Sequence, residues 1–490
     1  MKKAVLFKLG QLFHFYDCRH SIFCFTFAHQ KNSDAMIENR IHFIAIGGSA
    51  MHNLAIALNL KGYHVTGSDD EIVDPARTRL DSYGLLPGQF GWFPEKLDQS
   101  IDSIILGMHA RSDNPELARA KELGLKIYSY PEFLYEQSKD KLRVVIGGSH
   151  GKTTITAMIL HVMHYCGIDC DYMVGAKLEG FDVMVRLTEK AKIMVFEGDE
   201  YLTSPLDLRP KFHLYKPDIA LVSGIAWDHM NVFPTFNNYI EQFRIFMQMV
   251  PDNGALIYCE EDKEVRKVAE SVPGSMKKLP YGIPSYSVSD GKTRIITPDG
   301  EFALKVFGQH NLMNLEGARL VCNQLDISNS DFYKAISSFN GASNRLELIN
   351  EKPGFNAYRD FAHAPSKLKA TIQAVKEQYP ERKLVACFEL HTFSSLNKDF
   401  LAQYADSMEK ADQAIVYFSP HALALKKLPM LQPGDIMTAF HKNNLLVFSD
   451  SGKLQEYLHD LEWGNSNLLL MSSGNFDGVQ LKDFAESLNV

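Results

Sequence analysis

The sequence predicts an α/β protein built of three domains. Its 490 residues are enough for about three domains of ordinary size. From Arg40 onward, short apolar runs of strand length alternate with longer segments of helical periodicity. Two of these runs end in a glycine pair that leads directly into a helix. Strands that alternate with helices form parallel sheets, with functional loops at the carboxyl ends of the strands.

The domain boundaries are expected where these patterns restart. We expect a Rossmann-like N-terminal domain at residues 39–139 and a central P-loop α/β domain with a small β-rich section at residues 140–340. A second Rossmann-like domain is expected at residues 341–490. Residues 1–38 are predicted to be a disordered extension. They begin like a secretory signal, but charges interrupt the apolar segment, and we hypothesise that translation starts at Met36.

The composition excludes several classes of protein. The net charge is −8 and no basic tract is present, which argues against a nucleic-acid partner. No apolar run reaches about 18 residues, so we expect no membrane-spanning helix. The seven cysteines are scattered without a C-x-x-C pair, which indicates a reducing compartment and a cytoplasmic location. Cys166 and Cys170 are predicted to be buried thiols.

The first domain begins like half of a dinucleotide-binding fold. A strand at residues 41–46 leads into G-G-S-A-M and a helix at 51–60, and a second strand at 64–67 ends before an acidic residue. Glycines let the backbone approach a diphosphate, and the acidic residue can meet a ribose hydroxyl. A plain tight turn is the alternative, because the motif is not G-x-G-x-x-G. The candidate ligand-binding residues are Gly47, Gly48, Ser49, Ala50, Met51, Ser68 and Asp69.

A phosphate-binding loop opens the second domain. An apolar run ends at Gly147, and G-S-H-G-K-T-T leads into a helix. Backbone N–H groups at such a loop and at the helix N-terminus bind oxyanions. Lys152 is expected to reach the outer phosphates of a nucleotide, and the Thr153 hydroxyl to hold Mg²⁺. A chance Gly-Lys-Thr is the alternative, because Ile146 occupies the first glycine position of the full motif. The predicted loop residues are Gly148, Ser149, His150, Gly151, Lys152, Thr153 and Thr154.

Polar residues follow the neighbouring strands of this domain. Glu197 begins an acidic segment directly after a buried strand and is suited to Mg²⁺, with a solvated turn as the alternative. Asp228 and His229 follow the next strand and could contact metal or phosphate, although an ordinary loop histidine is the alternative. Asn311 and Asn314, at the start of a later helix, could read an adenine edge, with helix capping by Asn311 as the alternative.

The remaining segments complete the predicted organisation. Residues 251–308 contain three glycine turn signals and are predicted to be β-rich. A third α/β unit begins near Gly341, and its alternating strands and helices predict a parallel sheet. This unit carries Arg345 near its start and Asp360 and His363 after a strand.

Seven motifs in order resemble the Mur ligase family of peptidoglycan synthesis. They are GGSAM, SHGKTT, EGDE, DHMN, GQHNLMN, SNRLEL and DFAHAP, and the resemblance runs from about Arg40 to the C-terminus. It implies three domains that bind a uridine nucleotide, ATP with Mg²⁺, and an amino acid or peptide. It also implies that ATP activates a UDP-muramyl carboxylate as an acyl phosphate, which an amine then attacks. We expect a monomer or weak homodimer.

The resemblance assigns roles to individual positions. The N-terminal glycine turn would hold the UDP-sugar, and Asn311 and Asn314 match the H-N-x-x-N segment, whose second asparagine meets adenine. Apart from the resemblance, we expect His363 to orient substrate. The metal ligands implied are Thr153, Glu197 and His229. The catalytic set implied is Lys152, Glu197, His229, Arg345, Asp360 and His363, of which Arg345 and Asp360 reach the nucleotide from the C-terminal domain.

The resemblance leaves two nucleophiles to consider. The segments EGDEY…KF and MSSGNFDG are similar to the branch that attaches the recycled tripeptide L-alanyl-γ-D-glutamyl-meso-diaminopimelate to UDP-N-acetylmuramate. The alternative is L-alanine in primary synthesis. Enzymes that add L-alanine carry H-R-Y-x-R where this chain has HTFSS at residues 391–395, without either arginine.

Two departures from the family keep a different class of function open. Gly224 and Ala226 replace an asparagine and a glutamate that are common in the family. A nucleotide-binding regulator without ligase activity is therefore a further hypothesis.

Overall fold

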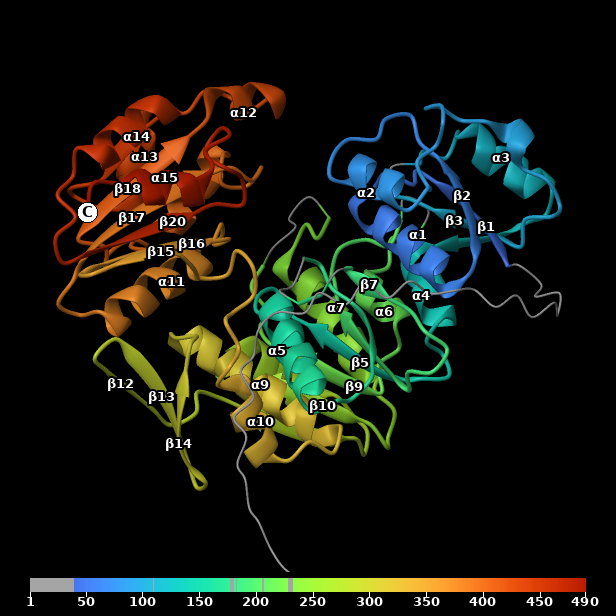
Figure 1. Cartoon of the computed structure of the whole chain (residues 1–490), viewed down its shortest axis with the longest axis horizontal. Helices are drawn as coiled ribbons and strands as arrows, with labels where there is room; N and C mark the ends of the chain where they lie inside the picture. The colour runs from blue at the N-terminus through green and yellow to red at the C-terminus, as the bar shows by residue number, and fades with distance from the viewer. Residues whose placement is uncertain (1–38, 109, 177–179, 182, 205–206, 228–231) are drawn as a thin grey trace, which may run out of the picture. The chain divides into compact units, whose positions relative to one another are not determined.

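The computed structural model describes residues 39–490, except residues 109, 177–179, 182, 205–206 and 228–231. It confirms the predicted α/β class, with sheets flanked by helices throughout the described ranges (Figure 1). The extension predicted at residues 1–38 and the predicted Asp228–His229 pair lie outside the described residues. In the part that is described, we find no helix with the length and apolarity needed to cross a bilayer.

The first sheet has the strand order β2-β1-β3-β4, and all its strands are parallel. Its strands are β1 (Arg40–Ile44), β2 (His64–Ser68), β3 (Ser103–Leu106) and β4 (Lys126–Ser129). Its helices are α1 (Ser49–Lys61), α2 (Ala76–Ser82), the 3₁₀ helix η1 (Pro94–Lys96), α3 (Pro115–Glu122) and α4 (Tyr130–Glu136). Local sequence sets where α3 and α4 begin, because Asn114 caps α3 and Ser129 forms a capping box with Glu132.

The second sheet has the order β11-β10-β9-β5-β8-β6-β7, in which β7 runs antiparallel to β6. Its strands are β5 (Leu142–Gly147), β6 (Asp171–Met173), β7 (Val185–Arg186), β8 (Ile193–Glu197), β9 (Ile219–Val222), β10 (Ala255–Cys259) and β11 (Lys277–Tyr281). Its helices are α5 (Lys152–Tyr165), α6 (Lys211–Leu214), α7 (Phe236–Gln248), α8 (Lys263–Ser271), α9 (Gln309–Gln324) and α10 (Asn329–Ile336). Helices α5 and α9 lie side by side against this sheet (Figure 1).

Two predictions about these domains need correction or refinement. Residues 251–308 are not one β-rich section, because β10 and β11 belong to the central parallel sheet and α8 separates them. Asp262 caps α8, and Val265, Val268 and Ala269 bury one face of it, a periodicity that the turn signals obscured. A separate antiparallel sheet is formed by β12 (Tyr286–Ser289), β13 (Lys292–Thr297) and β14 (Gly300–Leu304).

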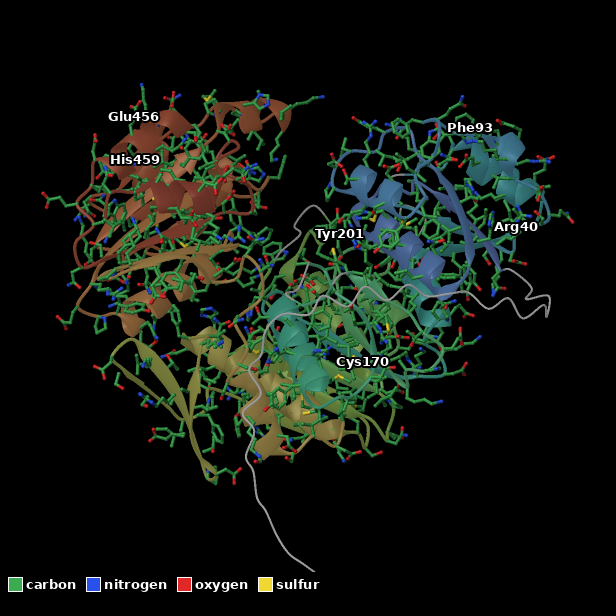
Figure 2. The ribbon with its side chains drawn as sticks, in the orientation of Figure 1. Arg40, Phe93, Cys170, Tyr201, Glu456 and His459 are labelled. Carbon is green, nitrogen blue, oxygen red and sulfur yellow. The ribbon has the colours of Figure 1, made fainter. Side chains whose placement is uncertain are left out.

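The predicted buried thiols are both free cysteines, but they differ in burial. Cys170, labelled in Figure 2, is buried, whereas Cys166 on the last turn of α5 is half-buried. The prediction is therefore correct for Cys170 and too strong for Cys166.

The third large sheet has the order β15-β16-β20-β17-β18-β19. Its strands are β15 (Glu347–Lys352), β16 (Phe355–Asp360), β17 (Lys383–Leu390), β18 (Gln413–Phe418), β19 (Leu446–Phe448) and β20 (Ser466–Met471). Its helices are α11 (Pro365–Gln378), η2 (Lys398–Tyr404), α12 (Pro420–Leu425), α13 (Pro433–Phe440), α14 (Ser451–His459) and α15 (Leu481–Ser487). We expected a wholly parallel sheet. This prediction is wrong at β15, which is antiparallel to β16. An edge strand buries little apolar surface, so the polar sequence of β15 did not predict a strand.

Strand order brings separate motifs to common sheet edges. The glycine loop follows β5, Ser223 follows β9 and Glu197 ends β8, and these three strands are neighbours in the second sheet. In the third sheet, Asp360 ends β16. Neighbouring parallel strands lie about 4.8 Å apart. The carboxyl ends of β9, β5 and β8 therefore place Ser223, the glycine loop and Glu197 close together.

The aromatic packing under the glycine loop generates a stability prediction. Phe212 is fully buried and its ring stacks on Phe246 with 4.5 Å between centroids. We expect Phe212→Ala to destabilise the protein by about 3–5 kcal/mol through the cavity that it leaves, measured as a lower urea midpoint. Phe393→Ala, at a side chain that is 56% exposed, is the matched control and should leave the midpoint nearly unchanged. Equal midpoints for the two variants would contradict this account of the core.

Candidate active site

The loop between β5 and α5 is held by close contacts that only glycine allows. Gly148 has φ +134°, and a Cβ there would lie 2.2 Å from Ser223 Oγ. Gly151 has φ +78°, and a Cβ there would lie 2.4 Å from Asn314 Oδ1. Gly151 is also the N-cap of α5 and offers no side chain to the first helical N–H groups. Those N–H groups are therefore available to an oxyanion, as the sequence predicts.

Lys152 is held by an acidic residue that follows β8. Its Nζ lies 2.6 Å from Glu200 Oε2 and donates to the Gly148 carbonyl. Burial alone would lower the pKa of Lys152, but the carboxylates of Glu200 and Asp199 outweigh it and raise that pKa. Lys152 is therefore a permanent cation.

Thr153 and Glu197 form a pair that fits Mg²⁺. The Thr153 hydroxyl donates to Glu197 Oε1 at 2.6 Å, and Gly175 N–H donates to Glu197 Oε2 at 2.7 Å. Mg²⁺ in nucleotide sites takes one or two protein oxygens and completes its shell with phosphates and water. This pair could supply the protein oxygens. Within the described ranges, no three or more His, Cys, Asp or Glu side chains form a metal cluster, and the predicted ligand His229 lies outside those ranges.

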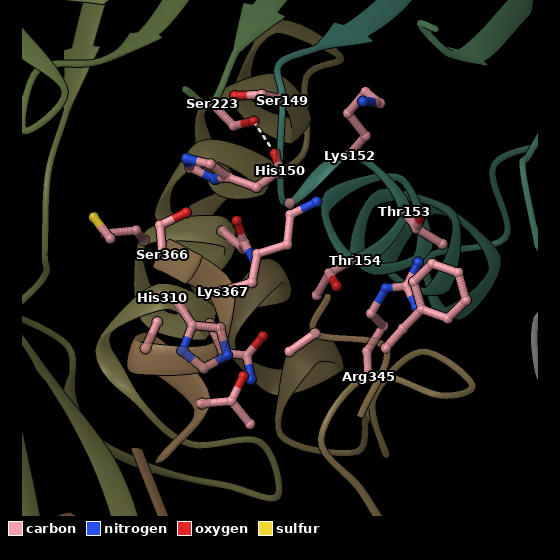
Figure 3. Close-up of a pocket in the computed structure, with 18 of the residues that line it drawn as sticks. Ser149, His150, Lys152, Thr153, Thr154, Ser223, His310, Arg345, Ser366 and Lys367 are labelled. Carbon is pink, nitrogen blue, oxygen red and sulfur yellow. Dashed lines mark hydrogen bonds between the residues drawn. The ribbon is translucent and has the colours of Figure 1, made fainter. Parts of the chain in front are cut away.

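The loop borders a cavity of about 410 Å³ whose other walls come from α9 and the third sheet (Figure 3). The cavity collects most of the predicted nucleotide-site residues. They are Ser149, His150, Gly151, Lys152, Thr153, Thr154, Glu197, Asn311, Asn314, Arg345, Asp360 and His363. Asn311 is not a helix cap, since Gly308 is the N-cap of α9 and Asn311 Nδ2 donates to the Phe307 carbonyl at 3.0 Å.

Arg345 and Asp360 shape the wall that belongs to the third sheet. The Arg345 guanidinium lies over the Phe361 ring at 4.5 Å from its centroid. Asp360 accepts hydrogen bonds from the N–H groups of Leu346 and Ala362 at 2.6 and 2.7 Å. Loss of solvation raises the pKa of Asp360, although the nearby Arg345 opposes that shift. Arg345 and Asp360 therefore present a cation and a carboxylate to the phosphate loop.

Two histidines of the cavity are uncharged at neutral pH. Loss of hydration lowers the pKa of His150 to about 4, and the positive charge of Lys367 contributes to this shift. The pKa of His310 is also lowered to about 4, again mainly by loss of hydration. Both rings therefore act as neutral polar or packing groups beside a nucleotide.

The structure explains one departure from the family pattern. A Cβ at Gly224 would lie 2.2 Å from His150 Nε2, so the imidazole occupies the space that an asparagine side chain would need. Ala226 contributes its backbone N–H to Ser149 Oγ at 2.7 Å, a contact that does not depend on its side chain. Both departures are compatible with an intact phosphate loop.

Several cavity residues were missed at the sequence level. They are Ser223, Cys259, Tyr281, His310, Met313, Ser366, Lys367, Ala370 and Thr371. Ser366 and Lys367 directly follow the A-H-A-P motif and could have been found from their position at a helix start. The other residues lie on strands or helix faces. Whether these elements reach the cavity depends on the order of the strands in the sheet, which the sequence does not show.

The N-terminal glycine turn is organised around Asp69. Its Oδ2 accepts the Gly47 N–H at 2.7 Å, and a Cβ at Gly47 would lie 2.9 Å from the same oxygen. Ser68 is completely buried, so its side chain would have to move to meet a ligand. Met51 packs in the core, whereas Ser49 and Ala50 are exposed on the first turn of α1. A sugar-nucleotide site here stays a prediction.

Comparison with known proteins places all three domains in one family. The model described as the Mur ligase middle domain matches residues 146–322. The Mur ligase family catalytic domain matches residues 40–141, and the Mur ligase glutamate ligase domain matches residues 344–474. The UDP-N-acetylmuramate--L-alanine ligase of Caldicellulosiruptor bescii is 31% identical over 391 residues, covering 77% of this chain and 83% of the relative.

Solved structures show the same fold. A murein peptide ligase from Psychrobacter arcticus superposes with a TM-score of 0.61 at 24% identity, covering 92% of this chain and 99% of that chain. The UDP-N-acetylmuramate-alanine ligase of Thermotoga maritima gives a TM-score of 0.67 at 19% identity, covering 91% and 98%.

The fold and the cavity define a three-domain α/β protein with a phosphate loop facing an arginine and an aspartate from the C-terminal sheet. The chain belongs to the Mur ligase family. It is accordingly an ATP-dependent ligase that forms carbon–nitrogen bonds.

The Gly151 contact predicts a specific loss of nucleotide binding. In Gly151→Ala the new Cβ would press on Asn314 Oδ1 and occupy a left-handed backbone conformation, so the loop must shift. We expect at least about tenfold weaker ATP binding by calorimetry. Gly167→Ala is the control, because Gly167 has φ +69° but open space around its Cβ. If both variants bind ATP equally well, close packing of the loop is not what nucleotide binding requires.

The two neutral histidines predict a pH dependence of stability. Their folded pKa values of about 4 lie below the value of about 6.5 of an unfolded chain. Between these values the unfolded state binds protons that the folded state does not, so their contribution is complete above pH ~6.5 and is lost as the pH falls toward ~4. The double variant His150→Gln/His310→Gln should show a shallower fall of the urea midpoint over this range. The exposed His421→Gln is the control, and an unchanged slope in the double variant would refute the assignment.

Proposed function

We propose that this protein joins the α-amine of an L-alanyl group to the carboxylate of UDP-N-acetylmuramate, with hydrolysis of ATP to ADP and phosphate, in peptidoglycan synthesis. The observation that carries the proposal is the single cavity that unites the phosphate loop, the Thr153–Glu197 pair and the Arg345–Asp360 wall. Three domains of one ligase family support it.

The proposed chemistry balances in two steps. A carboxylate oxygen of the sugar nucleotide attacks the γ-phosphorus of ATP, the bond to ADP breaks, and an acyl phosphate forms. The neutral amine then attacks the acyl carbon, the carbon–oxygen bond to phosphate breaks, and the amine releases one proton to solvent or base. Both reactants are anionic, so the first step requires positive charge and in-line positioning.

The chain's own residues fit these requirements. Lys152 neutralises phosphate oxygens, while the helix N-terminus after Gly151 binds them through N–H groups. Thr153 and Glu197 would hold Mg²⁺, which supplies charge neutralisation at the transferred phosphoryl group. Asn314, packed on the loop, is suited to the adenine, and Arg345 adds charge from the opposite domain.

Free L-alanine is the first candidate nucleophile. The relatives that share at least 30% identity over most of their length are named UDP-N-acetylmuramate--L-alanine ligases. The tripeptide L-alanyl-γ-D-glutamyl-meso-diaminopimelate presents the same alanyl amine and is the second candidate.

A specific observation favours the tripeptide as that second candidate. The loop after β17 has no arginine between His391 and Ser395, so it lacks a bidentate partner for the carboxylate of a single amino acid. Its conformation is tied to the buried Glu389, which accepts a hydrogen bond from Phe476 N–H at 2.8 Å and lies 3.4 Å from His391. In a peptide nucleophile the alanine carboxylate is an amide and needs no cation there.

The proposal is tested by phosphate release from Mg-ATP and UDP-N-acetylmuramate with either L-alanine or the tripeptide. We expect release with at least one of them, and the preferred nucleophile by kcat/KM identifies the reaction. Lys152→Ala should still fold, with a lower melting temperature because Glu200 loses its partner, and should lose at least about a hundredfold in kcat. Retained turnover in that variant would contradict the role of Lys152. ATP binding without phosphate release on either nucleophile would favour a regulator.

A further inference from the structure

We infer that Lys367 is a second phosphate-binding cation of this ligase, which acts on ATP from the C-terminal domain. The inference rests on the proposed use of the cavity for ATP. It adds a charge that is distinct from Lys152 of the phosphate loop and from Arg345.

The position of Lys367 on α11 points it at the phosphate loop. It is the third residue of a helix that begins at Pro365, and it lines the cavity together with Ser366, Ala370 and Thr371. They form two adjacent pairs that are one helical turn apart, so they present one face of α11 to the cavity. Figure 3 shows Lys367 in the middle of the lining, between His150 and Thr154, with its side chain extended toward the phosphate loop.

The electrostatics of His150 support this placement. After loss of hydration, the charge of Lys367 is the largest influence that lowers the pKa of His150, and it exceeds that of Lys152. His150 is the residue directly before Gly151, where the oxyanion-binding N–H groups begin.

Two further cations line the cavity and make defined contacts. Lys152 is paired with Glu200 at 2.6 Å, and the Arg345 guanidinium stacks on Phe361 and donates to the Asn344 carbonyl at 3.1 Å. A triphosphate beside the carboxylates of Glu197 and Asp360 is stabilised by each additional cation that lines the cavity. Lys367 brings that charge from a different domain, so its contact with phosphate would also bind α11 to the phosphate loop.

The test measures nucleotide affinity directly on the full chain. Dissociation constants for Mg-ATP, Mg-ADP and adenosine are determined by calorimetry for the wild type, Lys367→Gln and Lys367→Arg. We expect Lys367→Gln to weaken ATP binding by about tenfold to a hundredfold, ADP binding by less, and adenosine binding not at all. Lys367→Arg, which keeps the charge, should recover most of the ATP affinity.

The matched control is Lys369→Gln, because Lys369 lies two residues further along α11, is exposed and does not line the cavity. It removes the same charge from the same helix and should leave ATP affinity unchanged. Equal losses for ATP and adenosine in Lys367→Gln, or equal losses in the two lysine variants, would overturn the inference. A wild-type protein that fails to bind ATP at all would instead refute the use of this cavity, independently of Lys367.

Discussion

The structure of the active site depends on the tight packing of one glycine loop between two neighbours. Gly148 leaves no room for a side chain against Ser223 at the end of β9, and Gly151 leaves none against Asn314 on α9. The loop is thereby fixed between the sheet and a helix that follows it by more than 150 residues. Since backbone N–H groups bind phosphate only where they converge, this packing is what turns a β–α turn into a binding site.

The second constraint is the balance of charge around that loop. The described cavity carries Lys152, Arg345 and Lys367 against Glu197 and Asp360, while His150 and His310 are kept neutral by loss of hydration. Glu200 pairs with Lys152 at 2.6 Å, which limits the cost of burying this cation.

The site is divided between two domains, and this division suits the two-step reaction proposed above. The phosphate loop, Thr153 and Glu197 follow or end strands of the second sheet, whereas Asp360 ends a strand of the third. In the third sheet β20 lies between β16 and β17, and the Ser472 N–H donates to the Asp360 carbonyl at 3.0 Å. The buried Glu389 and the phosphate-facing Asp360 thus lie on one sheet edge, about two strand spacings apart.

The sequence by itself determined the α/β class, the phosphate loop, and the residues with polar chemistry at strand ends, because glycine spacing, caps and apolar periodicity are local. It did not determine β15, because a polar edge strand has little apolar alternation. It did not determine α8, because nearby turn signals led us to expect strands where a short helix forms. Only the tertiary structure brought Ser223, Tyr281 and His310 to the cavity. Their roles depend on which strands are neighbours and which helix faces the loop, and those relations are set by packing between segments far apart in the chain.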